Sequence, residues 1–145
     1  MPTYTAELTT VASPETAFAY LAQFDNTIHW DPGVIAASPV AGPPALGAKF
    51  DLTLQLGGGT EVLRYEIVEY APPHRVVLVA DGRRFVSHDE IVVAPAEAGA
   101  RITYTARLDL KGVMKIGAPF VARALRRAGD AAVSGLGREL ARPAR

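Results

Sequence analysis

The segment from Phe85 to Val93 carries the polar side chains with the clearest chemical potential. A strand in this segment would turn the apolar residues Ile91 and Val93 towards a core. Because strand side chains alternate between two faces, Phe85, Ser87 and Asp89 would then share that buried face. A carboxyl group on an apolar sheet face loses hydration, which raises its pKa and makes it a candidate acid or base. Asp89 is therefore the first candidate catalytic residue.

Two tyrosines, Tyr65 and Tyr104, are expected on the same inner face. Their hydroxyls could hold an oxyanion while Asp89 removes a proton next to a carbonyl, as an aldol-type cyclisation or dehydration requires. Two structural alternatives remain open. Asp89 could sit near a strand end and pair with Arg84 or Arg107, and the tyrosines could be packed core residues with satisfied hydroxyls.

Other kinds of catalytic or cofactor site find little support. The three histidines, His29, His74 and His88, show no metal-ligand spacing, and the chain has no cysteine. It also has no GxSxG motif, and Gly57-Gly58-Gly59 lacks the Lys-Ser/Thr of a phosphate-binding loop. We therefore expect no metal, no cofactor and no nucleotide.

Length and composition favour a single domain spanning residues 1–145. Apolar residues make up 49% of the 145 residues, and no window approaches the roughly 20 apolar residues of a membrane-spanning helix. The N-terminus lacks the features of a signal peptide, so a cytoplasmic protein is expected, either a monomer or a homodimer.

The formal net charge is zero but is unevenly distributed. Residues 1–72 carry eight acids and two bases, and residues 73–145 carry thirteen bases and seven acids. The basic C-terminal segment, with Arg123, Arg126 and Arg127, could be a solvated helix face or could meet an anionic membrane or partner. It has no interleaved aromatic residues, so nucleic-acid binding is not expected.

Hydrophobic periodicity predicts the elements that would hold these side chains. A strand is expected over residues 4–9, followed by a helix that Ser13-Pro14-Glu15 begins and, after Phe24, a second short turn up to Trp30. The pattern then predicts six antiparallel strands up to about residue 110, joined largely by hairpins, one of them at Gly57-Gly58-Gly59.

After residue 110 the period changes to three and four, which predicts an amphipathic helix of about 25–30 residues that Pro119 could kink or restart. Its apolar residues are Val113, Ile116, Phe120, Ala124, Ala128, Ala131 or Ala132, Leu136 and Leu140. This helix is the only element long enough to cover the apolar face of the sheet. Its many Ala and Gly residues would leave a cavity, or would simply let helix and sheet approach closely.

The sequence resembles the SRPBCC or START-like superfamily, and within it the polyketide cyclase/dehydrase and lipid-transport branch. The segments that carry the resemblance are residues 11–21 (VASPETAFAYL), Trp30-Asp31-Pro32, residues 47–50 (GAKF), residues 65–75 (YEIVEYAPPHR) and residues 99–104 (GARITY). The resemblance implies an α+β helix-grip fold: a curved antiparallel sheet of about seven strands around a long C-terminal helix, with one or two short helices after the first strand.

The resemblance also implies a cavity that holds a hydrophobic small molecule, such as a lipid, polyketide or quinone. A cyclase or dehydratase acting in the same cavity, and a lipid-presenting module that docks to a membrane or partner, remain alternatives. Trp30 is expected to cover one mouth of the cavity or to anchor the structure there. The expected ligand-binding residues are Trp30, Phe50, Leu52, Leu54, Tyr65, Phe85, Ser87, Asp89, Tyr104, Phe120 and Ala124.

Overall fold

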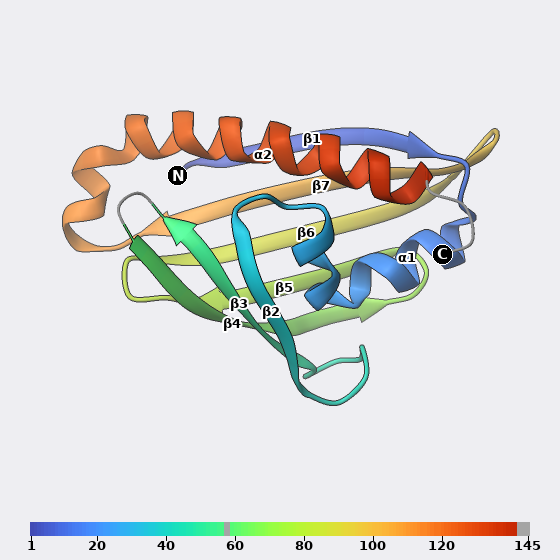
Figure 1. Ribbon diagram of the computed structural model, residues 1–145, viewed down its shortest axis with the longest axis horizontal. Helices are drawn as coiled ribbons and strands as arrows, with labels where there is room; N and C mark the ends of the chain where they lie inside the picture. Colours follow the sequence, from blue (N-terminus) through green and yellow to red (C-terminus); the bar gives the residue numbers. More distant parts are fainter. Residues whose placement is uncertain (57–58, 142–145) are drawn as a thin grey trace.

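The computed structural model describes residues 1–56 and 59–141, and these residues form one curved antiparallel sheet with helices on its concave side (Figure 1). The seven strands are β1 (Thr3–Thr10), β2 (Val34–Ala41), β3 (Lys49–Leu56), β4 (Gly59–Ala71), β5 (Arg75–Asp81), β6 (Phe85–Ala96) and β7 (Gly99–Leu110). Their order across the sheet is β1-β7-β6-β5-β4-β3-β2. The first strand therefore joins the last, and β1 and β2 form the two edges.

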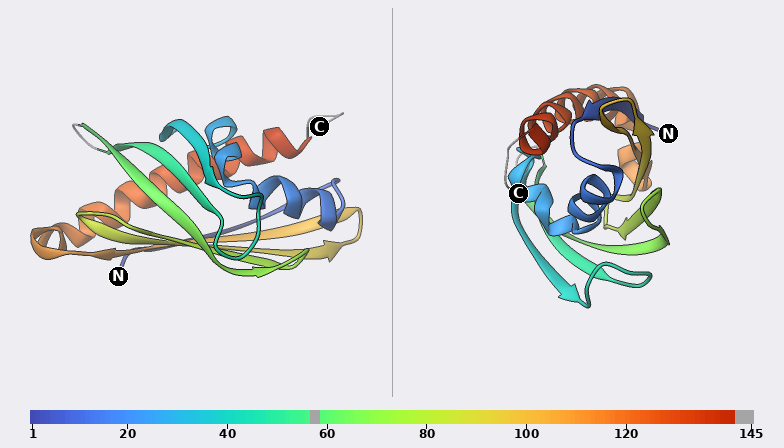
Figure 2. Two further views of the ribbon diagram at one scale, coloured as in Figure 1. Left: turned by 90° about the horizontal axis from the view of Figure 1, so that it is seen from below. Right: turned by 90° about the vertical axis from the view of Figure 1, so that its right-hand side faces the viewer.

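Two short helices separate β1 from β2. Helix α1 (Pro14–Ala22) begins as the sequence predicts: the Ser13 Oγ accepts the Thr16 N–H at 3.1 Å, and Pro14 lies at the first helical position. The 3-10 helix η1 (Phe24–His29) follows directly. Both sit inside the curve of the sheet, where buried residues such as Phe18 and Phe24 join the core (Figure 2).

The long C-terminal helix closes the concave side of the sheet. A 3-10 helix, η2 (Gly112–Gly117), leads into α2 (Ala118–Ala141), and Pro119 lies in the first turn of α2. Pro119 thus restarts the helix, since its missing N–H costs nothing in a first turn. Helix α2 lies beside β1 (Figure 1). Among the described residues no helix has the length and apolar character needed to cross a membrane.

Two glycines let α2 come close to the rest of the molecule. A Cβ at Gly135 would lie 2.1 Å from the carbonyl oxygen of Trp30, and one at Gly129 would lie 2.5 Å from the ring of Tyr4. Any larger side chain at these positions would push the helix away. The two glycines therefore allow the close approach of α2 to the edge strand β1 and to the segment after η1.

The rotational position of α2 differs from the one the sequence predicted. Leu136 and Leu140 are buried, whereas Phe120 is 74% exposed and Ala124 is also exposed. A helix turns by about 100° per residue, so Phe120 and Leu140, twenty residues apart, point in nearly opposite directions. A run with a strict spacing of four drifts around the helix, and the placement of Phe120 and Ala124 on the inner face was wrong for this reason.

The α+β architecture, the curved sheet and the long final helix are as the sequence predicts. Strand β2 was the least visible in the sequence, since Pro39 and two register irregularities interrupt its pairing with β3. Gly57 and Gly58 of the predicted turn lie outside the described residues, and so do the basic residues Arg142 and Arg145.

Candidate functional site

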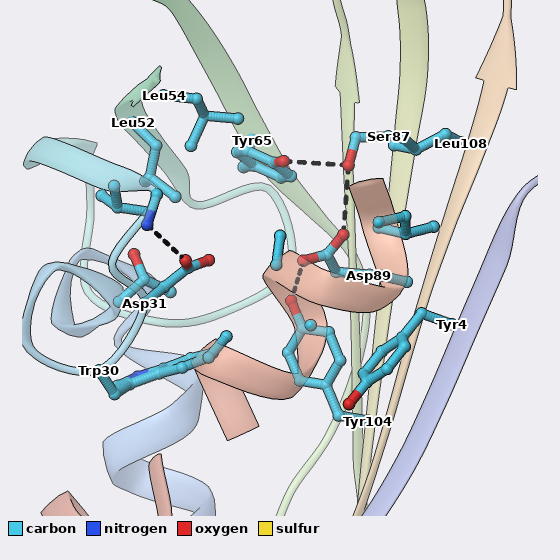
Figure 3. A pocket seen from close by; sticks show the side chains of 18 of the residues that line it. Tyr4, Trp30, Asp31, Leu52, Leu54, Tyr65, Ser87, Asp89, Tyr104 and Leu108 are labelled. Carbon is cyan, nitrogen blue, oxygen red and sulfur yellow. Dashed lines mark hydrogen bonds between the residues drawn. The ribbon is translucent and has the colours of Figure 1, made fainter. Parts of the chain in front are cut away.

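A cavity of about 170 Å³ lies between the concave face of the sheet and α2 (Figure 3). Its wall is mostly apolar or aromatic, with few polar side chains. Gln55 of β3 and Ala128 of α2 line it and are both exposed, so the cavity opens to solvent between these two elements. The lining residues are Tyr4, Phe24, Thr27, Trp30, Asp31, Gly33, Val34, Leu52, Leu54, Gln55, Tyr65, Phe85, Ser87, Asp89, Tyr104, Ala106, Leu108, Leu125, Ala128, Gly129, Ala132 and Val133.

The polar side chains of the sheet meet in one hydrogen-bonded chain on the cavity wall. The Tyr65 hydroxyl donates to the Ser87 Oγ at 3.0 Å, and the Ser87 hydroxyl donates to Oδ1 of Asp89 at 3.2 Å. The Tyr104 hydroxyl donates to Oδ2 of the same carboxyl group (Figure 3). Both carboxyl oxygens of Asp89 thus have a partner, which is why a side chain that is only 5% exposed is tolerated there.

The strand register explains how residues from three strands reach one another. Tyr65 on β4 lies opposite Ala80 on β5, and Ala80 in turn lies opposite Ser87 on β6. The small alanine leaves room for the tyrosine ring to reach across the intervening strand. Similarly, Ala106 lies opposite Asp89, so Tyr104, two residues earlier on β7, reaches the carboxyl group diagonally.

Burial shifts the ionisation of this network. Loss of hydration raises the pKa of Asp89 from 3.8 to about 6, although the hydrogen bonds from Tyr104 and Ser87 oppose the shift. The pKa values of Tyr65 and Tyr104 are raised well above 10, first by burial and then by the neighbouring Asp89 charge. Asp89 can therefore change its protonation state near neutral pH, while both tyrosines keep their protons.

A second carboxyl group, that of Asp31, faces the cavity from the segment between η1 and β2 (Figure 3). Its Oδ1 accepts the N–H of Gly33 at 2.9 Å, and burial raises its pKa. The neighbouring Trp30 is 3% exposed, and its ring meets that of Tyr104 edge-on, with centroids 5.9 Å apart. Its indole N–H is buried and has no hydrogen-bond partner among the described residues.

The structure brings eight of the eleven expected ligand-binding residues to the cavity wall: Trp30, Leu52, Leu54, Tyr65, Phe85, Ser87, Asp89 and Tyr104. Phe50 is fully buried in the core against Phe24 instead, and Phe120 and Ala124 point to solvent. The alternative pairing of Asp89 with Arg84 or Arg107 is wrong. Arg84 binds Glu61 on the surface, and Arg107 lies beside Asp109.

Sequence reasoning missed several lining residues. Asp31 lay in a recognisable Trp-Asp-Pro segment, but nothing in that segment shows which way the side chain turns. Tyr4 could have been found from the alternation of the first strand. The helix residues Leu125, Gly129 and Val133 follow from the buried positions of Leu136 and Leu140 once a turn of about 100° per residue is applied. Within residues 1–56 and 59–141, no group of three or more His, Asp or Glu side chains could hold a metal ion.

Comparisons with known proteins agree with this geometry. The model of a family described as polyketide cyclase/dehydrase and lipid transport matches residues 1–141. The fold is similar to that of the protein TTHA0849 from Thermus thermophilus, with a TM-score of 0.81 and 16% identity over 96% of this chain and 97% of that one. It is also similar to a START superfamily protein from Mycobacterium smegmatis, with a TM-score of 0.79 and 14% identity over 95% and 96% of the two chains.

The di-domain ARO/CYC StfQ from the steffimycin biosynthetic pathway aligns over 97% of this chain and 50% of its own length, with 17% identity and a TM-score of 0.73. At these identities the structural likeness shows the fold alone. Among curated proteins, none matches this sequence.

Proposed function

The chain belongs to the polyketide cyclase/dehydrase and lipid transport family, and from this premise we propose that it binds a hydrophobic small molecule in the cavity beneath α2. The observation that carries the proposal is an apolar cavity with a single polar network, Tyr65-Ser87-Asp89-Tyr104, on one wall. Pockets for small organic ligands have this composition, because apolar walls supply affinity and a few placed polar groups orient the ligand.

The size of the cavity indicates which part of a ligand it encloses. A dry cavity of roughly 150 Å³ holds one benzene ring, so the 170 Å³ here is suited to a compact ring system. A longer molecule would extend through the opening beside Gln55 and Ala128. We therefore propose that the enclosed part is a ring or short chain whose polar end meets Asp89.

Binding can be tested with 1-naphthol as a neutral two-ring probe, measured by isothermal titration calorimetry. Ala132→Leu places a larger side chain on the cavity wall, and Ala131→Leu makes the same change at the exposed neighbouring position. We expect the first variant to bind naphthol at least about tenfold more weakly than wild type and the second to bind it normally. Ala128→Leu, at the opening, provides a second blocking variant. Equal affinity in all four proteins would contradict the proposal.

A second candidate function, proton transfer to and from carbon, is favoured by the position and pKa of Asp89. A base is most effective when its pKa lies near the working pH, and that of Asp89 is about 6. The carboxylate would take a proton from a carbon next to a ligand carbonyl. Once Asp89 is protonated, the Tyr104 hydroxyl no longer has to donate to it and can donate to the enolate oxygen. The same proton, delivered to a different carbon of a conjugated enolate, completes an isomerisation; delivered to a hydroxyl on the neighbouring carbon, which then leaves as water, it completes a dehydration.

This candidate can be tested with 2-tetralone in D₂O, following deuterium incorporation next to the carbonyl by NMR. Asp89→Asn should abolish the exchange that the wild-type protein accelerates while the ketone still binds. Asp51→Asn, on the outer face and paired with Arg64, is the matched control. A wild-type protein that binds 2-tetralone but exchanges its protons no faster than buffer would leave binding as the function and remove the enzymatic candidate.

A further inference from the structure

The charge distribution of the cavity limits what can bind there. Asp31 and Asp89 both face it, and none of the described residues that line it is Lys, Arg or His. The Asp31 charge already raises the pKa of Asp89, so the two carboxyl groups are electrostatically coupled through the cavity. An anion placed between them would lose its hydration and meet two like charges without a cationic partner.

The direction of the hydrogen bonds adds a second, independent limit. An ionised carboxylate can only accept, so the Ser87 and Tyr104 hydroxyls must donate to Asp89, and the Tyr65 hydroxyl must donate to Ser87. The other two hydroxyls of the cavity wall also donate their hydrogens to groups within the protein. The Tyr4 hydroxyl donates to Asp130 at 2.8 Å, and the Thr27 hydroxyl donates to the Phe24 carbonyl at 2.8 Å.

The polar part of the wall therefore offers mainly acceptors and few donors. Lone pairs remain on the carboxyl oxygens of Asp89 and Asp31 and on the oxygens of Tyr104 and Ser87. Two donors are exceptions. The indole N–H of Trp30 is buried without a partner among the described residues and could serve one ligand oxygen. At the opening, the side-chain amide of Gln55 uses one N–H for the Gly59 carbonyl at 3.3 Å and keeps a second. A ligand whose polar end carries hydrogens, such as a phenol, an alcohol or an amine, matches this arrangement.

We propose that the cavity selects molecules whose polar end is neutral or cationic and donates hydrogen bonds, and that it rejects carboxylates with the same carbon skeleton. The inference rests on the proposed binding function and names the class of ligand. On this basis the cavity would bind hydroxylated or amino-substituted aromatic molecules in preference to fatty acids and other organic acids, which are also apolar but carry a negative charge.

Three probes on one skeleton test the selectivity: 1-naphthol, (1-naphthylmethyl)ammonium and 1-naphthoate, each titrated calorimetrically at pH 8. We expect naphthoate to bind at least about tenfold more weakly than the other two. Asp31→Asn and Asp89→Asn should each strengthen naphthoate binding and weaken ammonium binding, whereas Asp51→Asn on the outer face should change neither. The comparison of the three probes uses the wild-type protein alone, so it tests the selectivity even if a variant fails to fold.

The outcomes separate this inference from the function on which it rests. Naphthoate that binds wild type as tightly as naphthol, with Ala132→Leu weakening both, would overturn the selectivity and leave binding in the cavity intact. Absence of binding by all three probes, or binding that Ala132→Leu does not affect, would overturn the proposed function and the selectivity together.

A second inference rests on different residues, in η2 and the first turns of α2. Val113, Ile116 and Phe120 are 82%, 84% and 74% exposed, which is unusual for three large apolar side chains so close together. Arg123 and Arg127 lie within about 60° of Phe120 around the helix, and both are exposed. No ion pair joins either arginine to an acidic group in the described part of the chain. We call these five residues the apolar-basic patch.

We infer that the apolar-basic patch contacts the surface of an anionic lipid bilayer. Apolar side chains flanked by arginines match the interfacial region of such a membrane, where the side chains enter between headgroups and the guanidinium groups meet the lipid charges. Phe120 precedes the cavity-lining Leu125 by five residues, or about 7.5 Å along the helix. The contact would therefore place one end of the cavity close to the lipid.

Co-sedimentation with vesicles tests this contact. The wild-type protein should bind vesicles of phosphatidylcholine with phosphatidylglycerol and not vesicles of phosphatidylcholine alone. Phe120→Ser and Arg123→Glu should each reduce binding at least about fivefold, while Arg138→Glu, the same charge change near the other end of α2, should reduce it less. No binding to anionic vesicles, or an equal effect of both charge reversals, would overturn the inference. So would self-association without vesicles that Phe120→Ser abolishes, since a second copy would then be the partner.

Discussion

Replacing Asp89 with asparagine should change how the stability of the protein depends on pH. Burial raises the pKa of Asp89 from 3.8 to about 6, so the folded state binds a proton more tightly than the unfolded state. Its contribution to the free energy of unfolding is then largest at low pH and falls as the pH rises from about 4 to about 6. The full difference is about 3 kcal/mol, since each pKa unit corresponds to about 1.4 kcal/mol, and about 2 kcal/mol of it falls between pH 4 and pH 8.

The assay is urea unfolding at pH 4, 6 and 8, followed by the emission of Trp30, the single tryptophan, which is buried in the folded state. The stability of Asp89→Asn relative to wild type should rise by about 2 kcal/mol from pH 4 to pH 8, because asparagine cannot ionise. The groups around Asp89 that could titrate are Asp31, Tyr65 and Tyr104, and both tyrosines keep their protons over this range. A stability difference that stays constant with pH would refute the assignment of Asp89 as a buried carboxyl group with a raised pKa.

Three further predictions test the packing and the network. Gly135→Ala should lower the free energy of unfolding by about 1–3 kcal/mol, measured in urea, because its Cβ would collide with the Trp30 carbonyl. Gly137→Ala is the control and should be neutral or stabilising, since a Cβ there has nothing within 4 Å. Equal effects of the two changes would contradict the close helix contact. Tyr104→Phe should raise the pKa of Asp89 further in an NMR titration, since a hydrogen bond that favours the carboxylate is lost; an unchanged pKa would show that the bond is absent in solution. Phe120→Ser should change stability by less than about 0.5 kcal/mol, and a larger loss would mean that this ring is packed.

The arrangement of the site on the sheet could be predicted from the sequence because strand geometry has a single simple rule. Alternation from Ile91 and Val93 placed Ser87 and Asp89 on the buried face, and the same rule placed Tyr65 and Tyr104 there. Which of these hydroxyls would reach the carboxyl group depends on register and on the small residues Ala80 and Ala106 between them. The pairing register of neighbouring strands depends on tertiary packing, so the alternation in a single sequence does not predict it.

The helical and loop parts of the site were harder to predict. On α2 the repeated spacing of four residues resembles a stripe, but it drifts by about 40° at each step and cannot remain on one face. The loop residue Asp31 is placed by its hydrogen bond to Gly33 and by the close approach of α2 at Gly135, and both are tertiary effects. Sequence patterns therefore locate the sheet side of the cavity, while helix packing determines the opposite side.

A crystal structure of the protein with 1-naphthol would show directly whether the cavity beneath α2 is the binding site. We expect the naphthalene rings between Ala132 and the sheet, with the hydroxyl within hydrogen-bonding distance of the Asp89 carboxyl group. Naphthol bound only on the outer surface, for example against the exposed side chains of Phe120 and Ile116, with the cavity wall unchanged, would contradict binding in the cavity.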